Sequence, residues 1–323
     1  MIAYPTVFVL GAGASMPYGF PSGAELLAEA KRYSADSLLK STCERMPMGA
    51  VRSFAQMLKL SQDESLDALL EHRPESDVKV GKLFMAAQLL SKEHDDMNGN
   101  PRGRPWFNYL FTRMAERVDS IGNFVEQNKV TFVTYNYDRL LEYKLTNGLH
   151  THYTAPVAEC AKALEHIKVI HLHGSLGTLY GGQSDVPYGC RRSDAESFED
   201  SKCQFISEAA DAIQIVHQAD PNTPEFRTAR EALGQAERVF FLGFSFGQQN
   251  VDRLGFQHIK KTAQIRLSSF GMASGEYDVY VRQPLSKFQL PYTDRASRAD
   301  GNENWDCRTT LEEHIGAIVR RYD

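Results

Sequence analysis

The sequence predicts an α/β fold in which a parallel sheet is flanked by helices. Four short apolar, β-branched runs recur along the chain, and each is followed by a polar or glycine-containing turn. Runs of this kind are typical of strands buried on both faces. A helix-like pattern follows most of them, and strand, turn and helix in repetition indicate a Rossmann-like parallel sheet. The predicted strands are Thr6–Leu10, Val130–Thr134, Lys168–Leu172 and Arg238–Leu242.

Helices are expected after the first, second and fourth strands, at Ser22–Arg32, Tyr137–Leu145 and Gln249–Ile259. Residues 33–128 carry mainly helical periodicity, so we interpret them as a helical insertion within a single domain that spans residues 1–323. Further helices are predicted there at Val80–Leu90, at Trp106–Val118, and after a capping box formed by Ser61 and Glu64 ahead of Leu66.

Two segments have the composition of loops, residues 95–105 and 180–202. A last helix is predicted at Thr309–Arg320, with Leu311, Ile315 and Ile318 on one face. That face can dock on the domain itself or on a partner, and the pattern favours the domain itself.

Composition argues against several classes of protein. The 323 residues are 42% hydrophobic, with a formal charge of −5 and no long Lys/Arg run, so no direct nucleic-acid binding is expected. Five widely spaced cysteines without a C-x-x-C pair predict reduced thiols and no structural zinc site. The N-terminus resembles neither a signal peptide nor a membrane span, so we expect a cytoplasmic protein without membrane contact.

The turn after the first strand, in the stretch Val7–Gly23, contains four glycines and two prolines. Gly11 and Gly13 between a strand and a helix fit a site where the backbone approaches a pyrophosphate. The dinucleotide fingerprint G-x-G-x-x-G is incomplete, because Met16 stands where its third glycine would be. A dehydrogenase is therefore disfavoured, and a plain glycine turn that packs a helix on a strand remains an alternative.

The other predicted strands also end in polar or glycine-containing turns. Asn136 and Asp138 follow the second strand, and Asp138 could equally be a helix cap. His173 and Gly174 follow the third strand; by strand alternation His171 shares a face with His173, a pattern that could also serve a metal. The fourth strand leads into Gly243 and Ser245, which suit a close contact with a ribose or phosphate.

These four stretches, in this order, resemble the sirtuin fold, and more closely its bacterial sirtuin-like branch than the protein deacylases. The matching motifs are GAG-x-S at Gly11–Ser15, x-N-x-D at Asn136 with Asp138, HG at His173 with Gly174, and G-x-S at Gly243–Ser245. The resemblance covers the sheet core, about half of the chain.

Two departures separate the sequence from the deacylases. Residues 19–23 read Gly-Phe-Pro-Ser-Gly in place of the family's G-I-P-D-F-R loop, and after His173 only Cys190 and Cys203 stand where a four-cysteine zinc ribbon would be. The branch that lacks both features resembles NAD-hydrolysing effectors of bacterial defence against phage. The resemblance thus implies an NAD+ glycohydrolase, with NAD as substrate and no metal.

The resemblance also assigns roles. Asn136 would orient water or a ribose hydroxyl, His173 would be the general base, and Asp138 would bind the nicotinamide carboxamide, while His171 is expected to be structural. The predicted catalytic residues are therefore Asn136 and His173. The predicted NAD-binding residues are Gly11, Ala12, Gly13, Ser15, Pro21, Ser22, Asp138, Gly243 and Ser245.

Other functions stay open at this stage. One alternative is an NAD-dependent protein deacylase or ADP-ribosyltransferase, and another is a non-catalytic sensor subunit that binds NAD or ADP-ribose. Because unrestrained NAD destruction would kill its host, we expect activity to be gated by a homo-oligomer, by a sensor protein encoded nearby, or by both.

Overall fold

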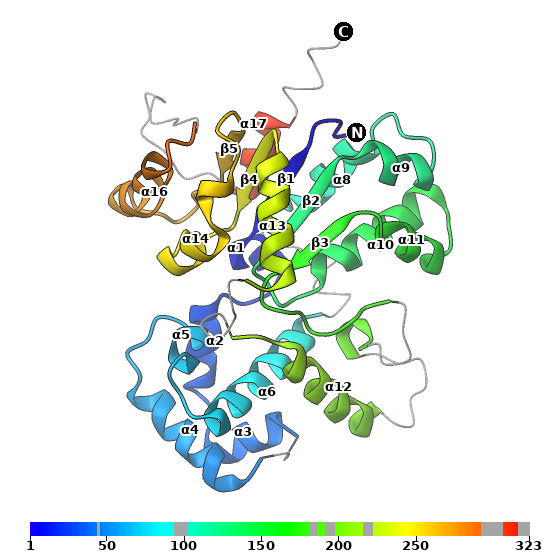
Figure 1. Cartoon of the computed structure of the whole chain (residues 1–323). Coiled ribbons are helices and arrows are strands. Elements are labelled where there is room, and N and C mark those ends of the chain that lie inside the picture. The colour runs from blue at the N-terminus through cyan, green and yellow to red at the C-terminus, as the bar shows by residue number, and fades with distance from the viewer. Residues whose placement is uncertain are drawn as a thin grey trace.

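The computed structural model describes residues 1–43, 46–93, 103–180, 186–190, 198–215, 222–291 and 306–315. Its centre is a five-stranded, all-parallel sheet in the order β3-β2-β1-β4-β5, flanked by helices (Figure 1). The strands are β1 Thr6–Leu10, β2 Val130–Thr134, β3 Lys168–His171, β4 Arg238–Leu242 and β5 Gln264–Leu267. The predicted α/β fold is confirmed: three predicted strands have the expected bounds, β3 is one residue shorter, and β5 is an addition.

The central strand β1 pairs with β2 on one side and β4 on the other, so that Leu10 lies between Thr134 and Leu242. The chain first adds β2 and β3 on one side of β1 and then crosses to add β4 and β5 on the other. Strand order therefore reverses between β1 and β4, the place where open α/β sheets bind ligands beyond their carboxyl ends.

Side-chain alternation divides the core between the two faces of the sheet. Phe8 stacks on Phe132 and Phe240 on one face, with ring centroids 5.2 Å apart in each pair. Val7 and Val9 belong to the core of the other face. The first face is packed by α8 Phe107–Ala115, α9 Ile121–Gln127 and α10 Leu140–Tyr153, and the second by α13 Pro224–Gln235, α14 Gln248–Leu254 and α16 Gln283–Lys287.

A lobe of helices lies beyond the carboxyl edge of the sheet (Figure 1). The lobe begins before residue 33 and includes α12 (Phe198–Ala212), so it extends beyond the predicted insertion of residues 33–128. Helices α8 and α9 belong to the predicted insertion but lie beside the sheet. The lobe and the first face of the sheet share one hydrophobic core. The lobe consists of α2 Gly23–Ala30, α3 Ala35–Ser41, α4 Met48–Leu60, α5 Leu66–Leu70, α6 Glu75–Lys92 and α12 Phe198–Ala212.

Local hydrogen bonds explain where the helices begin. Ser22 caps α2 in a capping box with Glu25, so this helix starts one residue later than expected. The predicted capping box of Ser61 and Glu64 is wrong, because Ser61 Oγ donates to Asp63 and Ser65 caps α5 instead.

The later helices follow the predictions with shifted ends. Helix α10 starts at Leu140 rather than Tyr137, after the turn that carries the polar residues, and is followed by α11 Val157–Leu164. The predicted helix after β4 divides into α14 and a short 3-10 turn, Phe256–His258. Residues 94–102, 181–185 and 191–197, in and around the two predicted loops, lie outside the described residues.

The expectation of reduced thiols is wrong for two cysteines. Cys43, just after α3, and Cys203 in α12 form a disulfide although they are 160 residues apart. The tertiary fold brings their Cα atoms to 5.4 Å, which spacing along the sequence could not reveal. Cys160 and Cys307 are buried free thiols.

The C-terminal helix α17, Cys307–His314, docks on the domain itself, as favoured above. Leu311 and Ile315 are buried, Thr310 Oγ1 donates to the carbonyl oxygen of Leu267, and Arg104 forms a 2.5 Å ion pair with Glu312. The predicted extension to Arg320, with Ile318, lies outside the described residues. Within the described part of the chain, every helix is too short or too polar to cross a bilayer.

Candidate functional site

The glycine turns that follow β1 and β4 interlock at the point where strand order reverses. Gly11 N–H donates to the carbonyl oxygen of Leu242, and Gly13 N–H donates to that of Gly243, at 3.0 Å each. A Cβ on Gly243 would lie 2.0 Å from Ala14 N, and Gly243 has φ +60°, so glycine is required there twice over. A Cβ on Gly11 or Gly13 would in turn collide with the backbone of Gly243.

This contact gives the predicted cofactor turn a second explanation. The plain packing alternative accounts for Gly11, Gly13 and Gly243, and the Gly13 N–H is already used within the protein. Gly243 N–H in turn donates to Ser268 Oγ. The interlocked turns place the short helix α1, Ala12–Ser15, directly at the carboxyl edge of the sheet.

A pocket opens beside α1 on the α10 side of this edge, and we call it the polar pocket. Its walls include Trp106 and Phe107 from the start of α8 together with Leu140 and Leu141 of α10. Its polar side chains are Ser15, Thr134, Asn136, Asp138, Glu142 and His171. The structure thus brings together three predicted site residues, Ser15, Asn136 and Asp138, from two separate strand ends.

Asn136 is held with one defined amide orientation. Its Nδ2 lies 3.1 Å from the carbonyl oxygen of Gly11 and 3.0 Å from Ser15 Oγ. Because a carbonyl oxygen can only accept, the amide nitrogen must face Gly11. Both hydrogens of Nδ2 are then engaged, and Oδ1 is the amide atom that can accept a hydrogen bond from a ligand.

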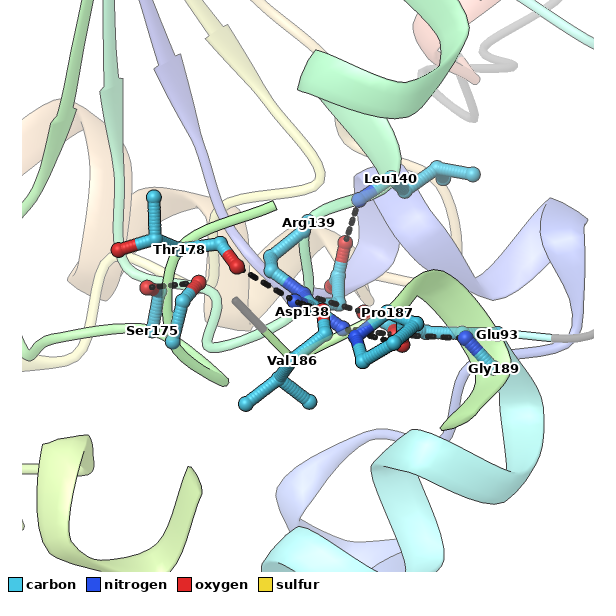
Figure 2. Close-up of polar contacts among 10 residues, drawn as sticks. Glu93, Asp138, Arg139, Leu140, Ser175, Thr178, Val186, Pro187 and Gly189 are labelled. Atoms are coloured by element: carbon cyan, nitrogen blue, oxygen red, sulfur yellow. Dashed lines mark hydrogen bonds and ion pairs between the residues drawn. The ribbon is translucent and has the colours of Figure 1, made fainter. Parts of the chain in front are cut away.

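Asp138 is a buried carboxyl group at the start of α10. Its Oδ1 accepts a hydrogen bond from the N–H of Leu140, the first residue of α10, at 3.2 Å (Figure 2), but the N-cap residue is Arg139, whose side chain makes no capping hydrogen bond. Burial raises its pKa to about 6, against the lowering effect of hydrogen bonds from Ser15 and Leu140. A carboxyl group that changes charge near neutrality, in the same pocket as the Asn136 amide, is suited to binding a polar ligand.

His171 also faces the polar pocket, although the sequence did not place it in the site. Its Nε2 lies 2.7 Å from Glu142 Oε1 and its Nδ1 lies 3.0 Å from the carbonyl oxygen of Asn136. Burial alone would lower the pKa of His171, but the charge and hydrogen bond of Glu142 outweigh it, and the pKa is raised.

His173 lies on the opposite side of the sheet edge. It is fully buried, with its ring 5.4 Å from the Tyr135 ring and 5.7 Å from Phe226 of α13. The expectation that His171 and His173 share a face is therefore wrong. β3 ends at His171 and Gly174 turns the chain with φ +72°, so strand alternation no longer applies at His173.

The remaining predicted residues lie around the two glycine turns. Ala12 is half-buried in α1, and Ser245 is exposed after β4. Ser22 is engaged in its capping box, and half-buried Pro21 follows Phe20, which is buried in the core. None of these four lines the polar pocket of the described structure.

Sequence reasoning missed part of the pocket. Trp106 Nε1 donates to the carbonyl oxygen of Ala14 in α1. Phe107 N–H donates to Tyr18 Oη in the 3-10 turn Met16–Tyr18 that follows α1. The sequence did not single out Glu142 as a site residue, because acidic residues are common in the first turn of a helix. Its position four residues after Asp138 in a predicted helix was the available signal.

A buried ion pair between Arg139 and Glu93 holds residues 186–189 in place. Arg139 and Glu93, both about 1% exposed, form a two-pronged contact at 3.0 and 2.5 Å (Figure 2). Arg139 Nη1 also donates to the carbonyl oxygen of Val186 at 2.5 Å, and Gly189 N–H donates to Glu93. The residue after Asp138 thus joins the end of α6 to residues 186–189.

Hydrogen bonds connect the lobe, and the residues just after α12, to the turns that follow β2 and β3. Tyr137 Oη donates to Asp67 of α5 at 2.6 Å and also lies 3.2 Å from the carbonyl oxygen of Gln214. Gln214 N–H donates to the carbonyl oxygen of His173 at 2.8 Å. A Cβ on Gly174 would lie 2.0 Å from the Ala212 carbonyl oxygen, so this glycine lets the end of α12 approach His173.

Within the described ranges no group of three or more His, Cys, Asp or Glu residues could hold a metal ion. Cys203 is tied to Cys43, and the side chain of Cys190 is outside the described part. The metal-free site therefore stays a prediction.

Comparison with known families finds a match to the SIR2-like domain over residues 130–278. This range contains Asn136, Asp138, His173, Gly243 and Ser245, whereas Gly11–Ser15 precede it. No curated protein matches the chain. SIR2-like domains are in general NAD-dependent enzymes, so the match supports a sirtuin-like family and NAD-related activity.

Proposed function

We propose that this protein is an NAD+ glycohydrolase that cleaves NAD to nicotinamide and ADP-ribose. The observation that carries the proposal is the polar pocket at the carboxyl edge, lined by Asn136 and Asp138 of the SIR2-like range, where Nδ2 of Asn136 is engaged by Gly11 and Ser15 and leaves Oδ1 as the accepting atom. An amide oxygen and a carboxyl group match the donors of a carboxamide and a ribose hydroxyl.

In the proposed reaction the bond between the nicotinamide nitrogen and ribose breaks, and water adds to the ribose carbon with loss of one proton. The transition state has oxocarbenium character, so a water-poor site with fixed dipoles lowers its energy. Asp138 would bind the nicotinamide carboxamide, and Asn136 would orient the water or a ribose hydroxyl. Gly11, Ala12, Gly13, Ser15 and, from the neighbouring turn, Gly243 and Ser245 would hold the rest of NAD.

His173 remains the proposed general base. His171 is unsuited, because both of its ring nitrogens face acceptors and its pKa is raised. His173 is buried against the rings of Tyr135 and Phe226, and its carbonyl oxygen accepts from Gln214 N–H, so we propose that residues 213–215 shift when NAD binds. We further propose that Pro21 and Ser22 contact the ligand only in that rearranged state.

The biological role that we propose is an effector of bacterial anti-phage defence that acts by abortive infection in the cytoplasm. Its activity would be gated by a homo-oligomer, a sensor protein encoded nearby, or both. Purifying the chain with and without the neighbouring gene product, and measuring mass and NAD turnover, tests this point. A constitutively active, isolated monomer would contradict it.

The central test is product analysis with the protein purified together with the neighbouring gene product, so that the gated state is assembled. We expect NAD to disappear while nicotinamide and free ADP-ribose appear in equal amounts, in the presence of a metal chelator. Transfer of ADP-ribose to protein, or loss of an acyl group from lysine, would instead show the transferase or deacylase, and NAD binding without turnover would show the sensor.

Two variants assign the catalytic residues. Asn136→Ala and His173→Ala should each lower the rate of NAD cleavage about a hundredfold or more, as expected for loss of a positioned catalytic group. His150→Ala, at an exposed histidine of α10, is the matched control and should retain activity. Circular dichroism checks folding, and wild-type turnover in a folded variant would remove that residue from the mechanism.

A further inference from the structure

We propose that His171, held as an imidazolium between Glu142 and the main-chain carbonyl group of Asn136, is the positioning residue that fixes where the side-chain amide of Asn136 lies. This inference rests on the proposed function, because it assigns His171 a task in that same site. Neither the family match nor the sequence motifs give His171 or Glu142 a role in the site.

The sheet itself delivers His171 to the Asn136 turn. In the parallel register of β2 and β3, His171 is the partner of Thr134, the last residue of β2. Asn136 lies two residues further along, so the imidazole reaches its carbonyl oxygen across the strand ends. Glu142, from the first turn of α10, closes the arrangement on the other ring nitrogen.

The two contacts together fix the protonation state. A carbonyl oxygen only accepts, so Nδ1 must carry a proton to bond Asn136. An ionised Glu142 also only accepts, so Nε2 must carry a proton as well. The side chains of His171 and Glu142 are 13% and 26% exposed, so the pair is partly screened from water, and the neighbouring Asp138 also favours the cation. The charges of His171 and Arg139 in turn keep Glu142 ionised, against the effect of its burial.

Three anchors hold Asn136, and His171 supplies the one on its carbonyl group. The backbone N–H of Asn136 donates to Thr134 Oγ1 at 3.0 Å, and Nδ2 is held by Gly11 and Ser15. Without the imidazolium, the peptide group between Asn136 and Tyr137 loses its restraint and can rotate. Because reacting groups must be placed within about 1 Å, a small displacement of the amide is enough to slow the reaction about a hundredfold.

The first experiment needs no activity. Nitrogen-15 NMR of the imidazole should show both His171 nitrogens protonated at pH 7, with a titration midpoint above the ordinary range for histidine. Glu142→Gln removes the carboxylate charge and should lower that midpoint. The side-chain amide signal of Asn136 should move with the His171 titration in the wild type and show no such titration in His171→Gln. A neutral His171 at pH 7, or an Asn136 amide indifferent to it, would overturn the proposal whether or not the protein cleaves NAD.

The second experiment uses NAD turnover. We expect His171→Gln to lower kcat about tenfold to a hundredfold with little change in KM, since binding contacts remain while the amide is displaced. On the alkaline side of the pH profile, wild-type kcat should fall as pH rises through the pKa of His171. Glu142→Gln should move that fall to lower pH.

A matched control separates positioning from stability. His150 also has its Nδ1 within hydrogen-bond distance of a backbone carbonyl, that of Ala155 at 2.6 Å, but lies exposed on α10. His150→Gln should leave kcat and its pH profile unchanged. If wild-type protein cleaves NAD and folded His171→Gln matches its kcat and pH profile, the inference fails while the proposed function stands. If wild-type protein does not cleave NAD, the proposed function fails and the NMR measurements alone decide the inference.

Discussion

The two sides of the sheet's carboxyl edge differ in chemistry although they share the same strands. On the α10 side lies the polar pocket, where Ser15, Asn136, Asp138, Glu142 and His171 are joined by hydrogen bonds or charge. On the α13 side, which we call the aromatic side, lie Tyr135, His173, Phe226, Phe244 and Phe246.

The difference shows that residues close in sequence can serve opposite sides of one edge. Tyr135 and Asn136 are adjacent, and His171 and His173 are two apart, yet each pair is divided between the two sides. The proposed reaction would therefore use groups from both sides at the edge itself. The polar side is held by buried charges, and the aromatic side is held by ring packing.

The largest expected effect comes from breaking the buried ion pair of Arg139 and Glu93. Arg139→Ala should lower the free energy of unfolding by about 3–5 kcal/mol, because it leaves Glu93 buried without its partner. Denaturant unfolding measures this. The control is Arg32→Ala, whose ion pair with Glu29 is largely exposed and should contribute less than about 1 kcal/mol. Equal losses in the two variants would show that the buried pair contributes no more to stability than the exposed one.

A somewhat smaller effect is expected where the glycine turns join. Gly243→Ala should destabilise by about 2–4 kcal/mol, because the added Cβ meets the backbone at Ala14 and an L side chain at φ +60° is strained. Gly122→Ala in α9 meets no atom within 4 Å and should be neutral or slightly stabilising, since alanine favours helix. A stable Gly243→Ala variant would mean that the turns can separate.

The smallest expected effect is a pH dependence that belongs to the polar side alone. The pKa of Asp138 is raised by burial to about 6, so its contribution to stability is present at low pH and is lost as pH rises through that value. The Asp138→Asn side chain cannot ionise, so the variant does not lose this contribution to stability as pH rises. Thermal melts between about pH 4 and 8 should therefore show the variant gaining Tm relative to the wild type as pH rises. A constant difference, or the opposite trend, would contradict the raised pKa.

The sequence by itself determined the α/β fold and the strand ends that are followed by polar residues. Strand periodicity and turn residues are local signals, so Thr6–Leu10, Val130–Thr134 and Arg238–Leu242 could be predicted to the residue. Because the carboxyl ends of parallel strands meet at one edge, Ser15, Asn136 and Asp138 could also be predicted to lie near one another.

Only the tertiary structure decided what surrounds those residues. The Cys43–Cys203 disulfide, the aromatic wall of Trp106 and Phe107, and the ion pair of Glu93 with Arg139 each join segments far apart in the chain. His171 and His173 look equivalent by alternation, and their separation depends on where β3 ends and on which helix packs against each ring. Periodicity fixes which face a residue takes within a strand, but beyond the last hydrogen-bonded pair the side chain follows the packing around it.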